Sequence, residues 1–215
     1  TSGVILFTKD RRANPGAHKM FLEHLAQKEY EALTVRPARL PSPEFSVDDE
    51  IARISPKSAQ GKWGAVKEGG DHAHTDFRVL EVHPSFLRVK ALPRTGRTHQ
   101  IRVHLASLGM PLLGDPLYGG PESLPGGGLA GGSAHSSDSR KKTGQAANAY
   151  LKKKGGAAAG ELAIPRVMLH AASLTFPHPI DGRLVTVVAP IPADFRAIID
   201  SADAHIRPGS IQSIP

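Results

Sequence analysis

The sequence contains no cysteine, and this absence excludes several kinds of site at once. A disulfide framework, a thiolate metal site and a cysteine nucleophile all require that residue. Long apolar runs are missing as well, since no window approaches the roughly 18 consecutive apolar residues of a membrane-spanning helix. From these two absences we expect no membrane partner, and we note that a cysteine-free chain is compatible with an intracellular location.

Charge is the first positive feature of the sequence. The 215 residues, enough for one domain or one and a half, carry 27 Lys and Arg against 20 Asp and Glu, a net charge of +7. An excess of this kind favours a polyanionic partner such as a nucleic acid. Charge alone fits equally well a basic protein that has no such partner. The chain starts at Thr1 rather than at methionine, so we expect that it begins inside a longer protein.

A glycine-rich stretch interrupts the chain in its second half. Half of the 22 glycines lie between Gly119 and Gly160, together with basic triplets at 140–142 and 152–154. Such a composition cannot bury enough apolar surface to order itself, so we predict one domain over 1–215 with a disordered insertion at about 121–162. We interpret the insertion as a passive loop, which costs little free energy. In the alternative, its basic triplets add non-specific phosphate contacts.

Local patterns predict several elements of secondary structure. The apolar run 3–8 is typical of a buried strand, and apolar residues recur at helical spacing over 17–27. The segment 30–35 predicts a strand, and 75–92 predicts a β-hairpin around the turn His83-Pro84-Ser85. Further strands and a closing helix are expected at 167–171, 173–176, 182–189 and 192–200. The polar segment 44–74 leaves its structure open.

The densest polar cluster spans residues 94–104. It leads into a predicted helix over 99–108, with Thr98 as its N-cap and Gly109 as its C-terminal stop. A helix N-terminus beside arginine side chains suits an anionic ligand, and Arg102 could pair with a carboxylate through both edges of its guanidinium. In the alternative, the cluster is only a solvated basic face.

Several segments in order make the sequence resemble the RluA-type pseudouridine synthases. The longest comprises Thr95-Gly-Arg-Thr-His-Gln-Ile-Arg-Val-His-Leu-Ala106, Gly109-Met-Pro111 and Gly114-Asp-Pro-Leu-Tyr-Gly119. Thr1-Ser2-Gly3 is similar to the end of the family's H-R-L-D-x-x-T-S-G motif, and Lys28-Glu-Tyr-Glu-Ala32 to its K-x-Y-x-A motif. Two later blocks also match, Met168-Leu-His-Ala171 and Phe176-Pro-His-Pro179.

The resemblance implies a fold and an activity. The fold would be α+β, with a mixed, mainly antiparallel sheet and flanking helices. The activity would be isomerisation of uridine to pseudouridine in ribosomal or transfer RNA, which needs no cofactor and no metal and requires the target base to be flipped out of its stack. The protein would be an intracellular monomer.

The resemblance also implies roles for single residues. Tyr30 would be the active-site tyrosine that stacks on the flipped uracil, and Arg102 would pair with the catalytic aspartate. Leu169 would pack against the base or the tyrosine. Arg97, His99 and Gln100 would lie near the RNA backbone or the flipped nucleotide. In the alternative, Tyr30 is only a buried aromatic residue and Leu169 only packs in the core.

The family's nucleophile has no match within these residues. Its aspartate stands three residues before the threonine that corresponds to Thr1, and neither Asp10 nor Asp115 replaces it by motif; we expect Asp115 to bond backbone in its turn. We therefore expect the 215-residue chain to be inactive by itself, with Arg102 lacking its carboxylate partner. The alternative function is that of a non-catalytic RNA-binding pseudoenzyme or RNA chaperone with the same fold.

Two other hypotheses have less support. A nucleic-acid-binding domain that inserts helix 99–108 into a groove would explain neither Tyr30 nor the later Leu-His-Ala block. The histidine pairs 72 and 74, and 99 and 104, raise the possibility of a metal site. We do not predict one, because the second pair is badly spaced for one helix face and no cysteine or paired carboxylates stand nearby in the sequence.

Overall fold

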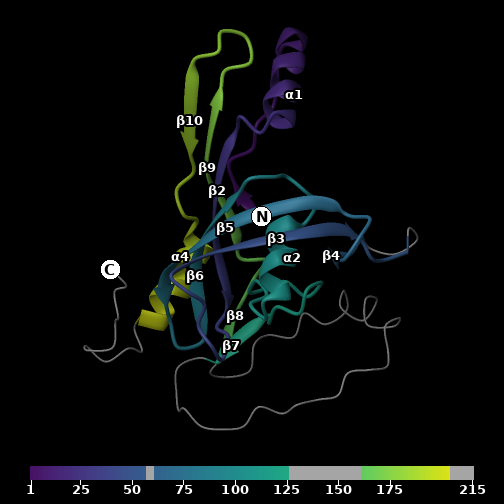
Figure 1. The fold of residues 1–215 in the computed structure, drawn as a ribbon. Coiled ribbons are helices and arrows are strands. Elements are labelled where there is room, and N and C mark those ends of the chain that lie inside the picture. Colours follow the sequence, from purple (N-terminus) through teal and green to yellow (C-terminus); the bar gives the residue numbers. More distant parts are fainter. Residues whose placement is uncertain (57–60, 126–160, 204–215) are drawn as a thin grey trace.

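One long sheet carries most of the fold (Figure 1). The computed structural model describes residues 1–56, 61–125 and 161–203. The sheet has eight strands in the order β1-β9-β2-β6-β5-β3-β4, with β10 also paired to β9, and only the pairing of β1 with β9 is parallel. The strands are β1 Ser2–Gly3, β2 Gln27–Val35, β3 Glu44–Arg53, β4 Trp63–Val66, β5 Asp71–Val82, β6 Phe86–Pro93, β9 Leu169–Pro177 and β10 Leu184–Val188.

Each face of the central strands is covered by its own helix. On β2, Ala32 belongs to a cluster with Leu105 of α2 (Gln100–Ser107), whereas Leu33 belongs to a cluster with Phe195 of α4 (Ala193–Asp203). All four side chains are fully buried. This division follows from the geometry of a strand, in which successive side chains point to opposite faces. The expected α+β class, with a mainly antiparallel sheet and flanking helices, is confirmed.

The far end of the sheet has a smaller core of its own. There α1 (Asn14–Leu22) contributes Met20, which packs with Leu174 and Phe176 of β9. Figure 1 shows α1 beside the tips of β9 and β10, at the end of the molecule away from α4. The first residues of the chain lie nearer the other end of β9, where Ser2 and Gly3 pair with His170 and Ala171.

Two predictions near the N-terminus are wrong in their bounds. The apolar run 3–8 is not a buried strand, because only Ser2 and Gly3 pair with β9 and the side chains of Ile5 and Phe7 are 73% and 76% exposed. The helix expected over 17–27 begins earlier and ends earlier, at Asn14 and Leu22. Pro15 lies in the first turn of this helix, where its missing N–H has no intrahelical partner to lose, so the helix can begin before the apolar pattern does.

The cap of α2 also differs from expectation. The helix starts at Gln100, its N-cap residue is His99 rather than Thr98, and no side chain caps it. His99 has a φ of 58°, in the left-handed region that non-glycine residues rarely adopt. Gly109 has a φ of 71°, as a glycine that ends a helix requires, so the predicted stop is confirmed.

A short two-stranded sheet stands at the edges of the predicted insertion. β7 (Ser123–Pro125) pairs antiparallel with β8 (Glu161–Ala163). Leu124 is buried in the same cluster as Leu33 and Phe195. The prediction of disorder over 121–162 is therefore wrong at both margins. Its remainder, 126–160, lies outside the described residues. Among the residues that are described, no helix is long and apolar enough to cross a membrane.

Candidate active site

A hollow of about 590 Å³ lies where β2, β9, the first residue of the chain and the start of α2 come together. All six residues that the sequence analysis selected line it, although they come from three separate parts of the chain. The full lining is Thr1, Phe21, Lys28, Tyr30, Pro93, Thr95, Gly96, Arg97, His99, Gln100, Ile101, Arg102 and Leu169.

Tyr30 stands in the middle of the sheet, at a β-bulge. The register of β2 against β9 shifts between Glu29 and Tyr30, and Tyr30 pairs with Ala91 and Ala171 on its two sides. Alanine neighbours leave room beside the ring. Burial raises the pKa of the tyrosine above its ordinary value, so the phenol is neutral at physiological pH. Its hydroxyl has no hydrogen-bond partner in the part of the chain that the structure describes.

Arg102 has a carboxylate partner within the chain, which corrects the expectation that it would lack one. Its Nε and Nη2 atoms donate to the two carboxylate oxygens of Asp115, at 2.8 and 2.7 Å. Asp115 is fully buried and its side chain, not only its backbone, is used. The two parallel hydrogen bonds hold the Arg102 guanidinium in one orientation. The Arg102 side chain is 18% exposed and still lines the hollow.

Tyr118 supports both Arg102 and His99. The Arg102 guanidinium lies 4.8 Å from the centre of the Tyr118 ring, a cation–π distance. The backbone N–H of Trp63 donates to the Tyr118 hydroxyl at 3.0 Å, which leaves the hydroxyl hydrogen for Nδ1 of His99 at 2.9 Å. Burial and the nearby Arg102 lower the pKa of His99, so its ring is neutral at physiological pH. If Tyr118 donates to Nδ1, the ring proton is on Nε2.

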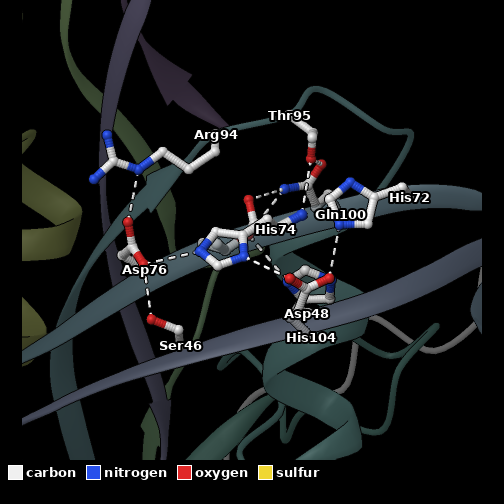
Figure 2. Close-up of polar contacts among 10 residues, drawn as sticks. Ser46, Asp48, His72, His74, Asp76, Arg94, Thr95, Gln100 and His104 are labelled. Carbon is white, nitrogen blue, oxygen red and sulfur yellow. Dashed lines mark hydrogen bonds and ion pairs between the residues drawn. The ribbon is translucent and has the colours of Figure 1, made fainter.

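Gln100 is buried rather than presented to a ligand. Its Oε1 accepts from the hydroxyl of Thr95 at 2.7 Å and from the N–H of Arg97 at 2.9 Å. Its Nε2 donates to the carbonyl of His74 and the hydroxyl of Thr75, both at 2.9 Å (Figure 2). The amide thus has all its bonding positions occupied inside the protein, and it ties the turn 94–99 to β5.

Arg97 and Leu169 complete the predicted set. Arg97 Nε donates to the carbonyl of His72 at 2.9 Å, and its side chain stays 37% exposed beside the hollow. Leu169 is 5% exposed and belongs to the same core cluster as Ala32 and Leu105, but it also lines the hollow. The leucine therefore serves both as core and as an apolar wall of the hollow, so the two interpretations of this residue are compatible.

The amino group of Thr1 lies at the same hollow. Burial is the main cause that lowers its pKa, and the positive charges of Arg166 and Arg102 lower it further. The group is therefore within electrostatic range of the buried Arg102–Asp115 pair. Thr1 and Arg102 line the same hollow.

Several residues of the site were not singled out by role from the sequence. Lys28 and Tyr118 both lie in the matched motifs, yet no role was assigned to either. Asp115 was expected only to bond backbone. Phe21 on α1 reaches the hollow because that helix stands beside the end of β2, a tertiary contact that no local pattern indicates. Among the described residues, no group of three or more His, Asp or Glu is arranged to hold a metal ion.

The family of the chain follows from comparison with known proteins. The sequence model of the family described as RNA pseudouridylate synthase matches residues 1–107. The ribosomal large subunit pseudouridine synthase D of Haemophilus ducreyi is 31% identical over 201 residues, which are 94% of this chain and 52% of that protein. This chain belongs to the RNA pseudouridylate synthase family. The ribosomal large subunit pseudouridine synthase C of Buchnera aphidicola is likewise 31% identical over 201 residues, 94% of this chain and 53% of that protein.

Solved structures of the family share the fold. The human RNA Pseudouridylate Synthase Domain Containing 4 aligns with a TM-score of 0.58 at 24% identity, over 90% of this chain and 69% of that one. The human Domain Containing 1 protein aligns with the same TM-score and identity, over 86% of this chain and 62% of that one. The present member of the RNA pseudouridylate synthase family spans about half the length of the curated relatives that it matches.

Proposed function

We propose that this chain is the catalytic domain of an RNA pseudouridine synthase that acts on ribosomal or transfer RNA. The observation that supports the proposal most directly is the convergence of Tyr30, Arg102 and Leu169 on one hollow. Three separate motifs supply these residues, and only the folded sheet brings them together. A flipped pyrimidine needs an aromatic face, an apolar wall and polar donors, and the hollow offers all three.

The reaction is an isomerisation, so the product has the same composition as the substrate, and the proton lost from C5 is balanced by one gained at N1. The N1–C1′ bond of uridine breaks, the uracil turns, and a C5–C1′ bond forms in its place. C5 loses its proton and N1 gains one. In this proposal the uracil stacks against Tyr30 with Leu169 behind it. Because the phenol is neutral, it assists removal of the C5 proton by giving its own proton to solvent as it accepts that one.

Arg97 and His99 act as donors to the nucleotide in this proposal. With Tyr118 donating to Nδ1, His99 has a proton on Nε2 for the nucleotide, and Arg97 keeps its guanidinium partly exposed. Gln100 acts one step away, since its amide is consumed in holding the turn that carries these two residues. We therefore propose a positioning role for Gln100 in place of direct RNA contact.

The nucleophile is an aspartate three residues upstream of Thr1 in the motif that this chain resembles. A span of three residues covers at most about 10 Å, and Thr1 itself already lines the hollow. Such an aspartate could reach the guanidinium of Arg102, which Asp115 engages through only two of its five N–H donors. The 215 residues alone are then expected to bind RNA without converting uridine.

A second candidate is an RNA-binding protein without catalysis, such as an RNA chaperone. The pairing of Arg102 with Asp115 favours it, because the arginine already has a carboxylate and the site is electrostatically complete without a nucleophile. The codons directly upstream of Thr1 separate the two candidates. His-Arg-Leu-Asp followed by two residues supports the synthase, whereas a start codon or another residue in place of Asp supports the second candidate.

Pseudouridine mapping in cells tests the synthase directly. RNA from cells that lack the gene will lose at least one pseudouridine, and the position lost identifies the substrate. The intact gene will restore it, and a gene carrying Tyr30→Leu will not, although that protein accumulates normally. An unchanged pseudouridine map in cells without the gene would contradict the proposal.

A further inference from the structure

Lys28 stands at the junction of three hollows. It lines the Tyr30 hollow of about 590 Å³, a second hollow of about 610 Å³ and a small one of about 190 Å³. The first two also share Pro93 and Thr95 as walls. An RNA strand that ran from the first hollow into the second would therefore pass over Lys28.

The ammonium of Lys28 has few partners for its degree of burial. Its Nζ donates to the carbonyl of Thr95 at 2.7 Å, and an ammonium has three donors. No carboxylate of the described residues lies within ion-pair distance of it, and the neighbouring Glu29 pairs with Lys90 instead, at 3.1 Å. Burial lowers the pKa of Lys28, and no acidic group offsets the shift. An isolated, half-buried cation gains most from an anionic ligand.

Three other basic side chains on the wall of the second hollow have carboxylate partners. Asp48 holds the rings of His72 and His74 at 2.7 and 3.0 Å, and Asp76 holds His74 and Arg94 at 3.0 and 2.7 Å (Figure 2). His72, His74 and Arg94 therefore each contact a carboxylate. Lys28, which lines the same hollow, has no such contact among the described residues.

We propose that Lys28 binds a backbone phosphate of the RNA, next to the nucleotide that is flipped onto Tyr30. The RNA strand would then run from the Tyr30 hollow across Lys28 into the second hollow. The polar walls of the second hollow would contact the neighbouring nucleotide. This inference rests on the proposed function, since it takes the flipped nucleotide as its reference point. Its chemistry requires only a phosphodiester, so it applies to single-stranded RNA of any sequence.

The salt dependence of RNA binding tests this assignment. For single strands, each neutralised phosphate contributes about 0.7 to the slope of log affinity against log salt concentration. Binding of the 215-residue protein to a single-stranded oligouridine is measured at several salt concentrations. Lys28→Gln is expected to weaken binding and to reduce the slope by about 0.7, because the amide can still bond Thr95 but carries no charge. Lys28→Arg is expected to restore the slope.

Lys67→Gln is the matched control, because it removes the same charge from an exposed lysine between β4 and β5 that lines none of the three hollows. It should leave the slope unchanged. A Lys28→Gln protein with weaker binding but an unaltered slope would overturn the phosphate assignment and leave the proposed function standing. If the unmodified protein shows no RNA binding at all, both proposals fail.

Discussion

Asp115→Asn removes the charge that fixes Arg102 and is expected to destabilise the protein strongly. The substitution keeps the shape of the side chain, but it leaves a guanidinium facing an amide at a fully buried position. Breaking a buried pair by removing one partner costs about 3–5 kcal/mol. Because Arg102 is 18% exposed and water can solvate part of its charge, we expect the lower end of that range, about 3 kcal/mol.

Urea denaturation measures this loss. With a slope of about 2 kcal/mol per molar urea, 3 kcal/mol corresponds to a midpoint lower by about 1.5 M. Asp10→Asn is the control, because it breaks another forked Arg–Asp pair whose two side chains are 84% and 45% exposed. Its midpoint should stay close to that of the unmodified protein. Equal midpoints for the two variants would refute the reasoning that burial, rather than pairing geometry, makes the Asp115 contact important.

Three further predictions concern single side chains around the site. His104 is fully buried, its Nδ1 meets Thr75 at 3.0 Å, and burial lowers its pKa to about 4. Between pH 6.5 and 4 the unfolded chain therefore takes up a proton that the folded protein excludes, and stability should fall by about 2–3 kcal/mol; a His104→Gln protein unfolded in urea across this range should lack that part of the loss. Gln100→Leu leaves four internal polar groups without their partner and should cost about 2–3 kcal/mol in urea denaturation, and an unchanged midpoint would contradict the positioning role. Tyr118→Phe removes the hydroxyl that orients His99 and should weaken oligouridine binding several-fold in a filter assay while the ring stays packed; unchanged affinity would show that His99 does not need this support.

His74 changes stability with pH in the opposite sense to His104. Hydrogen bonds from its ring to Asp48 and Asp76 raise its pKa. The stabilisation it gives is therefore complete below the ordinary histidine pKa of about 6.5 and is lost as the pH rises through the higher value in the folded protein. Comparing each single histidine variant with the unmodified protein separates the two effects, because they act over different pH ranges.

The parts of the fold that the sequence predicted are those with strong local patterns. The hairpin of β5 and β6 alternates apolar and polar residues around His83-Pro84-Ser85, and the structure confirms it. The strand from Tyr30 to Val35 and the end of α2 at Gly109 are confirmed for similar reasons. β3 escaped prediction because its outward positions are charged, as at Asp48 and Glu50, so its composition is that of a polar loop.

The run 3–8 failed for the converse reason. Its residues have the composition of a buried strand, but only Ser2 and Gly3 pair with β9, at His170 and Ala171. From Ser173 to Pro177 the same edge of β9 is occupied by β10, so the rest of the run has no strand to pair with there. The composition of a segment shows that it could form a buried strand, but whether it does depends on a neighbouring strand with a free edge.

The candidate site divides in the same way. Motif resemblance selected six residues, and all six line one hollow. It could not select the partner of Arg102, because Asp115 lies 13 residues away across a helix and a turn. Nor could it show that Gln100 points inward, since its burial depends on Thr75 and Thr95 from two other segments.

Tritium release from RNA labelled at uracil C5 is the most direct measurement of the proposed reaction, because forming the C5–C1′ bond expels that hydrogen into water. We predict release by the protein translated from the complete coding region, and none by the 215 residues from Thr1 onward, although both bind the RNA. Failure of the complete protein to release tritium from RNA that it binds would contradict the assignment as a synthase. Release by the 215 residues alone would show that the nucleophile lies within them.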